Sequence, residues 1–494
     1  MIDQAEKNIN IVMATAEASP YAKTGGLGEV VSAVSKALVG QGVSVSVFLP
    51  LYGHIDRDHF ALKSTGRSIT VPLSDRRESG EIFYSNRAGV HYYFIRHDPF
   101  FDRSNLYGTN EGDYPDNAAR FVFFSKAVLE SIRILGLEPD ILHTHDWHTG
   151  LLPLFLKREG ATDPSFRNIA SLFTIHNLGY QGIFWHYDWH LLNLPWDYFT
   201  SEALEFYGKI NFMKAGLVFA DALSTVSPRY AKEIQTAEYG CQLEGILRKR
   251  RKDLYGILNG IDTAEWDPSR DSYIAATYNS KSLEGKEVCK AALQKETGLP
   301  IRREIPLLAM ITRLSEQKGI DLIDAAFEQI IGAGVQLVVL GSGDKGYETR
   351  LQSLAQEYPQ QAVVKIAYDH TLAHRIEAGA DLFLMPSKYE PCGLNQMMSL
   401  RYGTVPVVRA TGGLDDTVTP FNPKTLKGNG FKFNSYTPTA FFRQIQQGLT
   451  LFREKKRWQS LIRNGMEGNY SWDNSAEKYI RLYQSLLKKK RGGR

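Results

Sequence analysis

Short runs of aliphatic and β-branched residues alternate along the chain with segments whose apolar positions recur every three to four residues. In the first half, such runs predict strands at 9–15, 43–49, 140–144, 169–175 and 222–226. Helical spacing follows several of these strands, at 28–39, 116–135 and 147–158. This alternation favours α/β domains built on parallel sheets.

The second half repeats the alternation more regularly. Each apolar run is followed by a helical segment, and the predicted strands are 305–312, 335–340, 362–367, 381–385 and 405–408. This series starts near "DLYGILNGID", and the polar stretch 263–300 is expected to be irregular. The pattern therefore predicts two doubly wound domains of similar size, with a boundary near 250–262.

Two segments depart from this alternation. Residues 62–97 include "GVHYYFIRH", whose alternating polar and apolar positions predict an antiparallel excursion. Residues 473–489 have an amphipathic helical pattern, with Asp473 or Asn474 as the N-cap. We therefore expect a final helix after the second domain.

Composition and charge narrow the function classes. With 494 residues, 43% of them hydrophobic, the chain is long enough for two cores and has a globular composition. A formal charge of +4 is small for this length and does not indicate nucleic-acid binding; the basic tail 488–494 is expected to be a solvated terminus. No apolar run reaches the ~20 residues of a membrane span.

The cysteines and the N-terminus predict a compartment. Cys241, Cys289 and Cys392 are widely spaced and odd in number, which is typical of a reducing environment. The segment "MIDQAEKN" leads directly into a predicted strand, without the pattern of a signal peptide. We therefore expect a cytoplasmic protein.

Two motifs suggest chemistry that their context does not favour. "GSGDKG" (341–346) fits G-x-G-x-x-G, but it lies inside the second domain and no acidic residue follows at the required spacing, so a close-packed turn is preferred over NAD binding. "HTHDWH" (143–148) could contribute metal ligands, yet Trp147 separates the aspartate from the last histidine. A loop that carries polar groups to a ligand is the preferred interpretation, and no metal is expected.

The segment "KTGGLGEV" (23–30) follows a predicted strand and begins a helix. Its glycines allow a ligand to approach the backbone, the helix N-terminus favours an anion, and Lys23 adds a positive charge. A tight turn alone would explain the glycines but not the lysine. "TGGLDDTV" (411–418) echoes this segment in the second domain, which predicts two comparable turns facing one cleft.

Charged residues also gather after two strands of the second domain. Arg313 and Lys318 follow the strand at 305–312 and suit a diphosphate, although two solvated surface charges would give the same pattern. Glu390, in "SKYEPCGLNQMM" (387–398), follows the strand at 381–385. A carboxylate there could orient sugar hydroxyls or simply cap a helix. Together the motifs predict two domains that clamp an anionic, sugar-bearing donor.

With these motifs the chain resembles the bacterial glycogen synthases and plant starch synthases, glycosyltransferases of family 5. The resemblance covers nearly the whole chain and rests on eight motifs in the family's order: "KTGGLGEV", "HTHDWHTG", "TIHNLGYQG", "STVSPRYAKEI", "GILNGID", "TRLSEQKG", "YEPCGLNQ" and "TGGLDDTV". It implies a GT-B fold of two Rossmann-like domains facing a cleft. The implied bounds are 1–253 for the acceptor-side domain, 254–470 for the nucleotide-sugar domain, and 471–494 for a helix and basic tail packing back on the first domain.

The resemblance also implies an activity. Such enzymes transfer glucose from ADP-glucose to the non-reducing 4-OH of an α-1,4-glucan, with retention, without a metal or other cofactor, in glycogen or starch synthesis. The implied partners are the donor and the glucan acceptor, with no nucleic acid and no membrane. A UDP-glucose enzyme of the same architecture and a catalytically silent glucan-binding protein stay open as alternatives.

Site residues follow from the resemblance, position by position. The catalytic group is implied to be Asp146, His176, Arg313, Lys318 and Glu390. Tyr368 is implied to stack on adenine, and Asn259 to lie near the sugar. The remaining substrate contacts are implied at Lys23, Gly25, Gly26, Cys392, Gly393, Leu394, Asn395, Gly412 and Gly413.

Three positions qualify the resemblance. Glu29 stands where the family mostly has aspartate, and Asn395 replaces a threonine common in bacterial members. Met398 occupies a position at which related glycosyltransferases carry a second glutamate. A retaining glycosidase needs two close carboxylates, and only Glu390 has a clear sugar-site placement, so front-face displacement is the favoured hypothesis.

Overall fold

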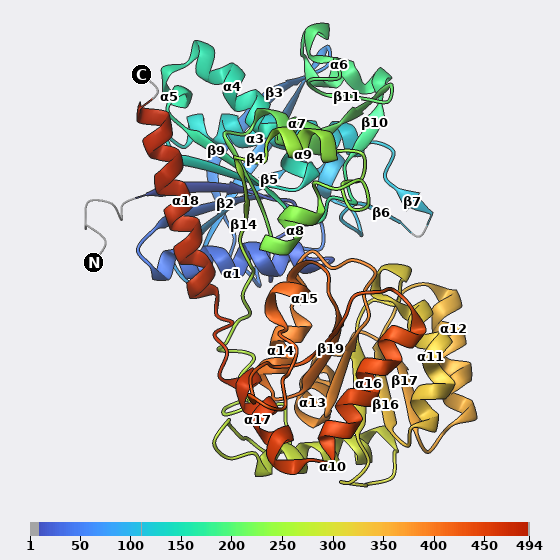
Figure 1. Cartoon of the computed structure of the whole chain (residues 1–494). Coiled ribbons are helices and arrows are strands. Elements are labelled where there is room, and N and C mark those ends of the chain that lie inside the picture. Colours follow the sequence, from blue (N-terminus) through green and yellow to red (C-terminus); the bar gives the residue numbers. More distant parts are fainter. Residues whose placement is uncertain (1–8, 110, 493–494) are drawn as a thin grey trace. The chain divides into compact units, whose positions relative to one another are not determined.

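The computed structural model describes residues 9–109 and 111–492 (Figure 1). The segment "MIDQAEKN" and the last two residues of the basic tail therefore lie outside the described residues. The chain divides into two compact units. The first comprises the chain to Val226, Ala231–Ile257 and the part from Trp472 onward, and the second comprises Ser227–Tyr230 and Leu258–Ser471.

The first unit is built on a nine-stranded sheet with the order β14-β13-β9-β8-β1-β2-β5-β4-β3. Its strands are β1 Asn10–Ala14, β2 Ser44–Pro50, β3 Lys63–Leu73, β4 Arg76–Arg87, β5 Val90–Arg96, β8 Ile141–His145, β9 Ala170–Ile175, β13 Ala222–Thr225 and β14 Leu254–Gly256. All pairs are parallel except β3–β4 and β4–β5, which confirms the antiparallel excursion. From β1 the sheet continues to β2 and β5 on one side and to β8, β9, β13 and β14 on the other. The strand order therefore reverses between β1 and β8.

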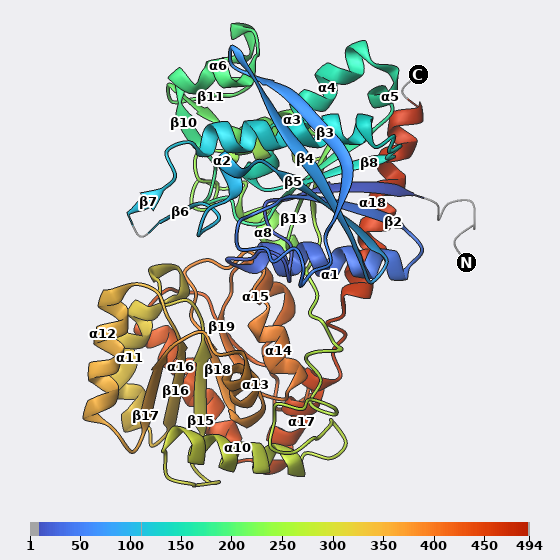
Figure 2. The same cartoon turned by 180° about the vertical axis from the view of Figure 1, so that it is seen from behind.

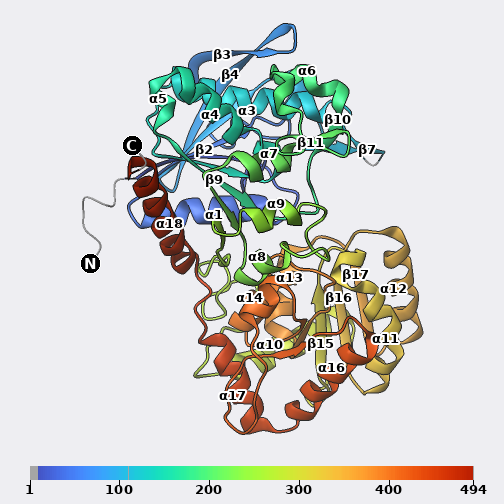
Figure 3. The ribbon, with the colours of Figure 1, turned by 45° about the horizontal axis from the view of Figure 1, so that its top comes forward.

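Helices cover both faces of this sheet (Figure 3). The longer ones are α1 Gly26–Gly40, α3 Asn117–Ile134, α4 Leu152–Thr162, α7 Phe212–Phe219 and α18 Trp472–Gly492. The shorter helices and turns are α2 Asp98–Phe101, η2 Trp147–Thr149, α5 Pro164–Arg167, η3 His186–Asp188, α6 Trp189–Leu192, η4 Trp196–Tyr198, α8 Pro228–Glu233 and α9 Glu244–Lys249. Two small sheets pair β6 Gly108–Thr109 with β7 Gly112–Asp113, and β10 Ile183–Trp185 with β12 Lys209–Asn211 and β11 Glu205–Phe206.

The C-terminal helix α18 belongs to the first unit (Figure 2). It packs against α1, and the side-chain amide of Gln41 donates to the carbonyl of Asp473 at 2.8 Å. The expected cap is wrong, because the helix begins at Trp472 and both Asp473 and Asn474 lie in its first turn. The apolar side of α18 is what fixes it to this unit, since Tyr479, Tyr483 and Leu486 are buried there.

The second unit has a six-stranded parallel sheet with the order β17-β16-β15-β18-β19-β20. Its strands are β15 Leu307–Ile311, β16 Gln336–Gly341, β17 Ala362–Ile366, β18 Leu382–Met385, β19 Val405–Arg409 and β20 Phe431–Phe433. This is the 3-2-1-4-5-6 order of dinucleotide-binding folds, with its switch point between β15 and β18. The helices are α10 Glu284–Thr297, α11 Ile320–Gly332, α12 Lys345–Glu357, α13 His370–Gly379, α14 Asn395–Arg401, α15 Gly412–Thr417, α16 Pro438–Phe452 and α17 Lys455–Met466, with the turn η5 Glu316–Lys318.

Three details differ from the sequence expectation. The strand β14, which we expected to start the second series, pairs with β13 at the edge of the first sheet. The stretch 263–300 is not irregular throughout, since α10 occupies Glu284–Thr297; its alternating lysines and glutamates obscured a narrow buried stripe. The predicted helix 147–158 is split into η2 and α4.

The "GSGDKG" segment is a close-packed turn. A Cβ on Gly341 would collide with the carbonyl oxygen of Thr312, and one on Gly343 with that of Leu314. Asp344 caps α12 by accepting from the amides of Gly346 and Tyr347. Packing against the neighbouring strand end therefore explains the glycines without a dinucleotide.

No helix in the described parts of the chain combines the length and the apolar character needed to cross a membrane.

Candidate active site

The switch point of the second unit brings Lys318 and Glu390 together. Lys318 lies in the loop after β15, and Glu390 in the loop after β18, its sheet neighbour. The Nζ of Lys318 and the Oε2 of Glu390 are 2.6 Å apart, and the hydroxyl of Ser387 donates to the same oxygen at 3.1 Å. Only 7% of the Glu390 side chain and 21% of the Lys318 side chain are exposed. The two charges are therefore a shielded pair at the edge of the sheet where ligands of such folds bind.

The two loops that carry this pair also hold each other. The amide of Lys388 donates to the carbonyl of Gln317 at 2.8 Å, and the Nζ of Lys388 lies 2.6 Å from the Oε1 of Glu316. Gly319, at φ +74°, lets the first loop pass over Pro386, where a Cβ would collide with the carbonyl oxygen. These contacts between the two loops hold Lys318 in position beside Glu390.

Three further residues in this part of the second unit have polar groups that a ligand could contact. Arg313 follows β15 directly and is exposed. The hydroxyl of Ser315 and the Oδ1 of Asn259 are buried and have no hydrogen-bond partner among the described residues. Because buried polar atoms are rarely left unpaired, these groups are candidates for contact with a ligand.

The segment after Glu390 is tightly packed. Burial raises the pKa of the Cys392 thiol to about 12, which keeps it neutral. Gly393 has a φ of +68°, and Leu394 precedes the start of α14. The side-chain amide of Asn395 donates to the carbonyl of Ile311 at 2.8 Å and so connects α14 to the end of β15. The residue that departs from the bacterial pattern therefore has a structural partner of its own.

The "TGGLDDTV" segment packs on the same loop. The amide of Gly413 donates to the carbonyls of Pro391, at 3.2 Å, and Glu390, at 3.3 Å. Gly412 has a φ of +44°, and a Cβ on it would collide with the carbonyl oxygen of Glu390. This turn therefore supports Glu390 through backbone contacts.

Tyr368 lies on another loop at the carboxyl edge of the second sheet. It lies between β17 and α13, and 79% of it is exposed. Because it follows the carboxyl end of a strand, it lies at the same edge of the sheet as Lys318 and Glu390. Its assignment to adenine stays a prediction.

In the first unit, the "KTGGLGEV" turn is held by Glu17, a residue that the sequence reasoning missed. The buried carboxylate of Glu17 accepts from the amide of Thr24 at 2.7 Å and from its hydroxyl at 2.9 Å. The hydroxyl of Tyr107 donates to the same carboxylate at 2.6 Å. A carboxylate two residues after a predicted strand was the available signal, because strand ends in doubly wound sheets carry the site residues.

The turn itself leaves its two glycines open. Gly25 precedes α1 with extended backbone, and a Cβ on either Gly25 or Gly26 would meet no atom within 4 Å. The Nζ of Lys23 lies 2.8 Å from the Oε1 of Glu29, with 39% and 43% of the two side chains exposed. The longer side chain at position 29 is thus used to reach the lysine.

Asp146 and His176 meet at the carboxyl ends of β8 and β9. The amide of His176 donates to the Oδ1 of Asp146 at 2.8 Å, and Asp146 adopts a φ of +56°. Burial raises the pKa of Asp146 to about 7, and the charge of Glu17 adds to this effect. Burial lowers the pKa of His176 to about 3, so its imidazole is neutral at pH 7. A ring nitrogen of His176 is hydrogen-bonded to the Nδ1 of His145 at 3.0 Å.

The other histidines of "HTHDWH" have structural contacts. His143 is hydrogen-bonded to the hydroxyls of Tyr483, at 2.8 Å, and Thr174, at 2.6 Å, so both ring nitrogens are occupied. His148 stacks between the rings of Trp147 and Tyr107. These contacts give His143 and His148 packing functions within the loop.

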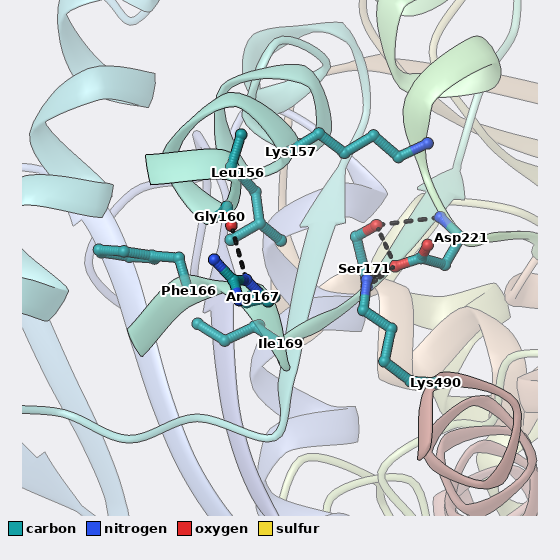
Figure 4. Close-up of a pocket in the computed structure, with 10 residues that line it drawn as sticks. Leu156, Lys157, Gly160, Phe166, Arg167, Ile169, Ser171, Asp221 and Lys490 are labelled. Atoms are coloured by element: carbon teal, nitrogen blue, oxygen red, sulfur yellow. Dashed lines mark hydrogen bonds and ion pairs between the residues drawn. The ribbon is translucent and has the colours of Figure 1, made fainter. Parts of the chain in front are cut away.

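A pocket of the first unit lies away from these residues (Figure 4). Its walls include Lys157 of α4, Arg167 of α5 and Lys490 of α18 around Asp221, which accepts from the amide and hydroxyl of Ser171. Ser171 and Asp221 stand at the amino ends of β9 and β13, the opposite edge from Asp146 and His176. No predicted site residue lines this pocket.

Each unit therefore places its predicted side chains at the carboxyl ends of its own parallel strands, with Lys318 and Glu390 beside the switch point of the second sheet. Two Rossmann-like units of this kind are the architecture of the GT-B class of glycosyltransferases. Residues 10–249 match the family described as "Starch synthase catalytic domain", and residues 294–465 match "Glycosyl transferases group 1".

Individual relatives match nearly the whole chain. A glycogen synthase of Koribacter versatilis (strain Ellin345) is 49% identical over 96% of this chain and 98% of its own length. That of Anaeromyxobacter sp. (strain Fw109-5) is 48% identical over 97% of this chain and 99% of its own. The chain therefore belongs to the family of glycogen and starch synthases and is a glucosyltransferase of glycogen or starch synthesis.

Solved structures agree with this assignment. The catalytic domain of starch synthase IV from Arabidopsis thaliana, bound to ADP and acarbose, has a TM-score of 0.89 and 33% identity; the match covers 97% of this chain and 100% of that one. A sucrose-phosphate synthase from Thermosynechococcus elongatus, with 18% identity and a TM-score of 0.61 over 97% of this chain and 99% of that one, shares the fold.

Proposed function

We propose that this enzyme transfers glucose from ADP-glucose to the non-reducing 4-OH of an α-1,4-glucan, with retention and without a metal or other cofactor. The observation that carries the proposal is the Lys318–Glu390 pair at the switch point of the second unit. The Arabidopsis relative, bound to ADP and acarbose, supports an adenine nucleotide and a glucan-like ligand. The glycogen synthase relatives of this chain, together with its three free cysteines, support action in the cytoplasm.

Lys318 and Arg313 are assigned to the diphosphate. Both follow β15, and Lys318 is held by Glu390 in a shielded position, where a charge interacts strongly with a bound anion. Glu390 has a second function in this proposal, which is to accept from the sugar hydroxyls on its 3-OH side. The bound diphosphate gives Lys318 a second anionic partner besides Glu390. The lysine can therefore stabilise the negative charge that develops on the diphosphate as ADP leaves.

The first unit supplies a neutral imidazole and a cationic turn. His176 is uncharged at pH 7, so it can hydrogen-bond a sugar hydroxyl without placing a cation beside the developing positive charge on the ring. Asp146 holds the amide of His176 and thereby its position. Lys23 and the open backbone at Gly25 and Gly26 are assigned to the phosphate and sugar of the donor.

The chemical step proposed is a front-face displacement. The bond between the anomeric carbon and the β-phosphate oxygen breaks, and the acceptor O4 forms a bond on the same face. The proton of the 4-OH passes to the departing phosphate oxygen, so ADP leaves with the proton and no enzyme carboxylate becomes a nucleophile. Lys318 and Arg313 stabilise the leaving diphosphate.

Exposed aromatic rings support a glucan acceptor. Trp185, Tyr187 and Tyr207 of the segment that carries β10, β11 and β12 are 66%, 69% and 75% exposed. The rings of Trp185 and Tyr187 are stacked at 6.1 Å between centroids. Large exposed rings are expensive to leave in water, and the apolar faces of glucose units can cover them.

The decisive experiment measures incorporation of labelled glucose into glycogen from ADP-glucose and from UDP-glucose side by side. We expect incorporation from ADP-glucose to exceed that from UDP-glucose by at least tenfold. The reverse preference would replace the donor by UDP-glucose, and no incorporation from either donor by folded protein would leave only the silent glucan-binding alternative.

A matched pair of lysine variants tests the function assigned to the Lys318–Glu390 pair. Lys318→Ala should lower kcat by at least 100-fold, whereas Lys295→Ala, which removes an exposed lysine at the end of α10, should leave it unchanged. Lys318→Ala leaves the buried carboxylate of Glu390 without its ion pair and could therefore lower stability. Thermal melting of each variant, together with Lys318→Arg, which keeps the charge, separates an effect on catalysis from an effect on folding. Near-normal turnover in folded Lys318→Ala would contradict the assigned role.

A further inference from the structure

A second cluster of titratable side chains lies in the second unit, outside the residues assigned to glucosyl transfer. His370 and His374 stand four residues apart on α13, and Glu265 comes from the segment between β14 and α10. One ligand atom of each of the three residues lies within 4.8 Å of the others. The Nε2 of His370 is 2.8 Å from the Oε1 of Glu265.

His374 has the features of a prepared ligand. Its side chain is completely buried, and its Nδ1 is hydrogen-bonded to the Oδ2 of Asp271 at 2.8 Å. Asp271 also accepts from the hydroxyl of Tyr402, so its carboxylate is the acceptor and the Nδ1 of His374 carries the proton. In the neutral imidazole the Nε2 of His374 then offers its lone pair, and this atom finds no hydrogen-bond partner among the described residues.

The ring of His374 is also fixed in orientation. The indole of Trp266 stacks on it with 3.9 Å between centroids and 9° between planes. Leaving a buried ring nitrogen unpaired costs free energy. His97, His145 and His148 also have such an atom, but among the described residues His374 is the one that lies with two further ligand side chains in a group of three. In metal sites this arrangement recurs, since a ligating imidazole usually donates its other N–H to a carboxylate.

We propose that Glu265, His370 and His374 bind a divalent transition-metal ion of the zinc class. Two imidazoles and one carboxylate form a ligand set that zinc takes in proteins, with a fourth position left for water. Glu265 and His370 are 46% and 38% exposed, which gives the ion a route from solvent and the water its place. Imidazole ligands exclude Mg²⁺ and Ca²⁺, which prefer oxygen.

The bound ion replaces one hydrogen bond with a cross-link. It joins the segment around Glu265 to the start of α13, which the His370–Glu265 contact and the stacking of Trp266 on His374 already connect. Zinc ligands at roughly 2.0–2.1 Å lie about 3.3 Å from each other in a tetrahedron. The His370 and Glu265 atoms, at 2.8 Å, need only a small separation to admit the ion.

Calorimetric titration of the untagged, chelator-treated full chain with Zn²⁺ tests the site. We expect one site per chain with a Kd below about 10 μM, and a rise in Tm of several degrees at saturation. His370→Ala and Glu265→Gln should weaken binding at least 30-fold and remove the Tm shift. Both side chains are partly exposed, so these variants keep the buried His374 and are expected to fold.

Two controls make the result specific. His59→Ala removes an exposed histidine of the first unit and should bind Zn²⁺ like the parent chain. Co²⁺ in the parent chain should give the visible absorption of a tetrahedral site, and this band should be lost in His370→Ala. A Kd above about 100 μM, or equal affinity in the parent chain and in His370→Ala, would overturn the proposal. None of these readouts uses glucosyl transfer, so they stand or fall apart from the proposed function.

Discussion

The two units contain the same four letters, Thr-Gly-Gly-Leu, at the start of a helix, and they use them for different purposes. In the first unit the segment runs from Thr24 into α1, and in the second from Thr411 into α15. Both follow the carboxyl end of a parallel strand. The sequence echo predicts comparable turns, and in their position after a strand they are comparable.

Their surroundings are not. In the second unit, a Cβ on Gly412 or Gly413 would collide with the backbone of Glu390 or Cys392, and Gly412 has a positive φ. In the first unit, Gly25 and Gly26 have open space where a Cβ would stand. Backbone packing therefore requires the glycines of one turn, whereas no described residue within 4 Å requires those of the other.

This difference separates two reasons for a glycine. Where the fold needs it, the residue carries no direct information about a ligand. Where the fold leaves space, a ligand that approaches the backbone is the remaining physical explanation, and at "KTGG" a lysine and a helix N-terminus add the charge that an anionic donor needs. Substitutions in the two turns should consequently affect different measurements.

Gly413→Ala should have the largest effect, and the effect should be on stability. Its methyl group would overlap the carbonyl of Cys392, so the loop of Glu390 must move or the turn must open. We expect the free energy of unfolding of the second unit to fall by about 3 kcal/mol. Urea denaturation followed by tryptophan fluorescence measures it, with Gly25→Ala as the matched control. Equal denaturation midpoints for Gly413→Ala and the parent would show that the packing distinction is wrong.

Gly26→Ala should be the converse case. Because its methyl group meets no atom and alanine favours a helix over glycine, stability should stay equal or rise by up to about 1 kcal/mol. If the donor approaches this backbone, kcat/KM for ADP-glucose should fall about 30-fold, which corresponds to roughly 2 kcal/mol. Steady-state kinetics and melting curves of one preparation give both values. Unchanged kcat/KM would remove the ligand explanation for the open glycines.

How far the sequence predicts this molecule can be seen at the same places. Hydrophobic spacing predicted ten parallel strands correctly, namely β1, β2, β8, β9, β13, β15, β16, β17, β18 and β19, and it predicted the antiparallel excursion in 62–97, because each is a strongly patterned run. It missed α10, whose buried stripe is narrow, and it assigned β14 to the second series, because partnership with β13 is a tertiary contact.

The site shows the same limit. Residue type and position after a strand were enough to nominate Lys318 and Glu390, but not to show that they form an ion pair. Glu17 was missed because its function is to hold Thr24, and such a contact depends on how a loop folds back over seven residues. Likewise, identical Thr-Gly-Gly-Leu letters could not reveal that one turn is packed and the other open.

Glu17→Gln should weaken the first turn without unfolding it. Glutamine keeps one accepting oxygen but has an NH2 donor in place of the other, so it cannot accept from the Thr24 amide and from the Thr24 and Tyr107 hydroxyls together, and it also loses the charge that strengthens these bonds. We expect KM for ADP-glucose to rise about tenfold, equivalent to roughly 1.4 kcal/mol, with kcat less affected. The counterpart in the second turn is Asp415→Asn, which loses an ion pair with Lys432 and should change stability rather than KM. A KM effect from Asp415→Asn and none from Glu17→Gln would reverse the comparison.

Glu29→Asp should have the smallest effect, although it restores the residue that the family mostly carries. The Lys23–Glu29 pair is about two-fifths exposed on both sides, and exposed ion pairs contribute at most about 1 kcal/mol. The shorter aspartate holds Lys23 less closely, so the lysine becomes more available to an anionic donor, and KM for ADP-glucose should fall by no more than about threefold. Because salt screens exposed charges, this difference should vanish at 0.5 M NaCl, where the Debye length is only a few ångströms. A tenfold or salt-independent change in KM would mean that Glu29 contacts the donor itself. Donor binding at the open turn would then depend on this carboxylate as well as on Gly25 and Gly26.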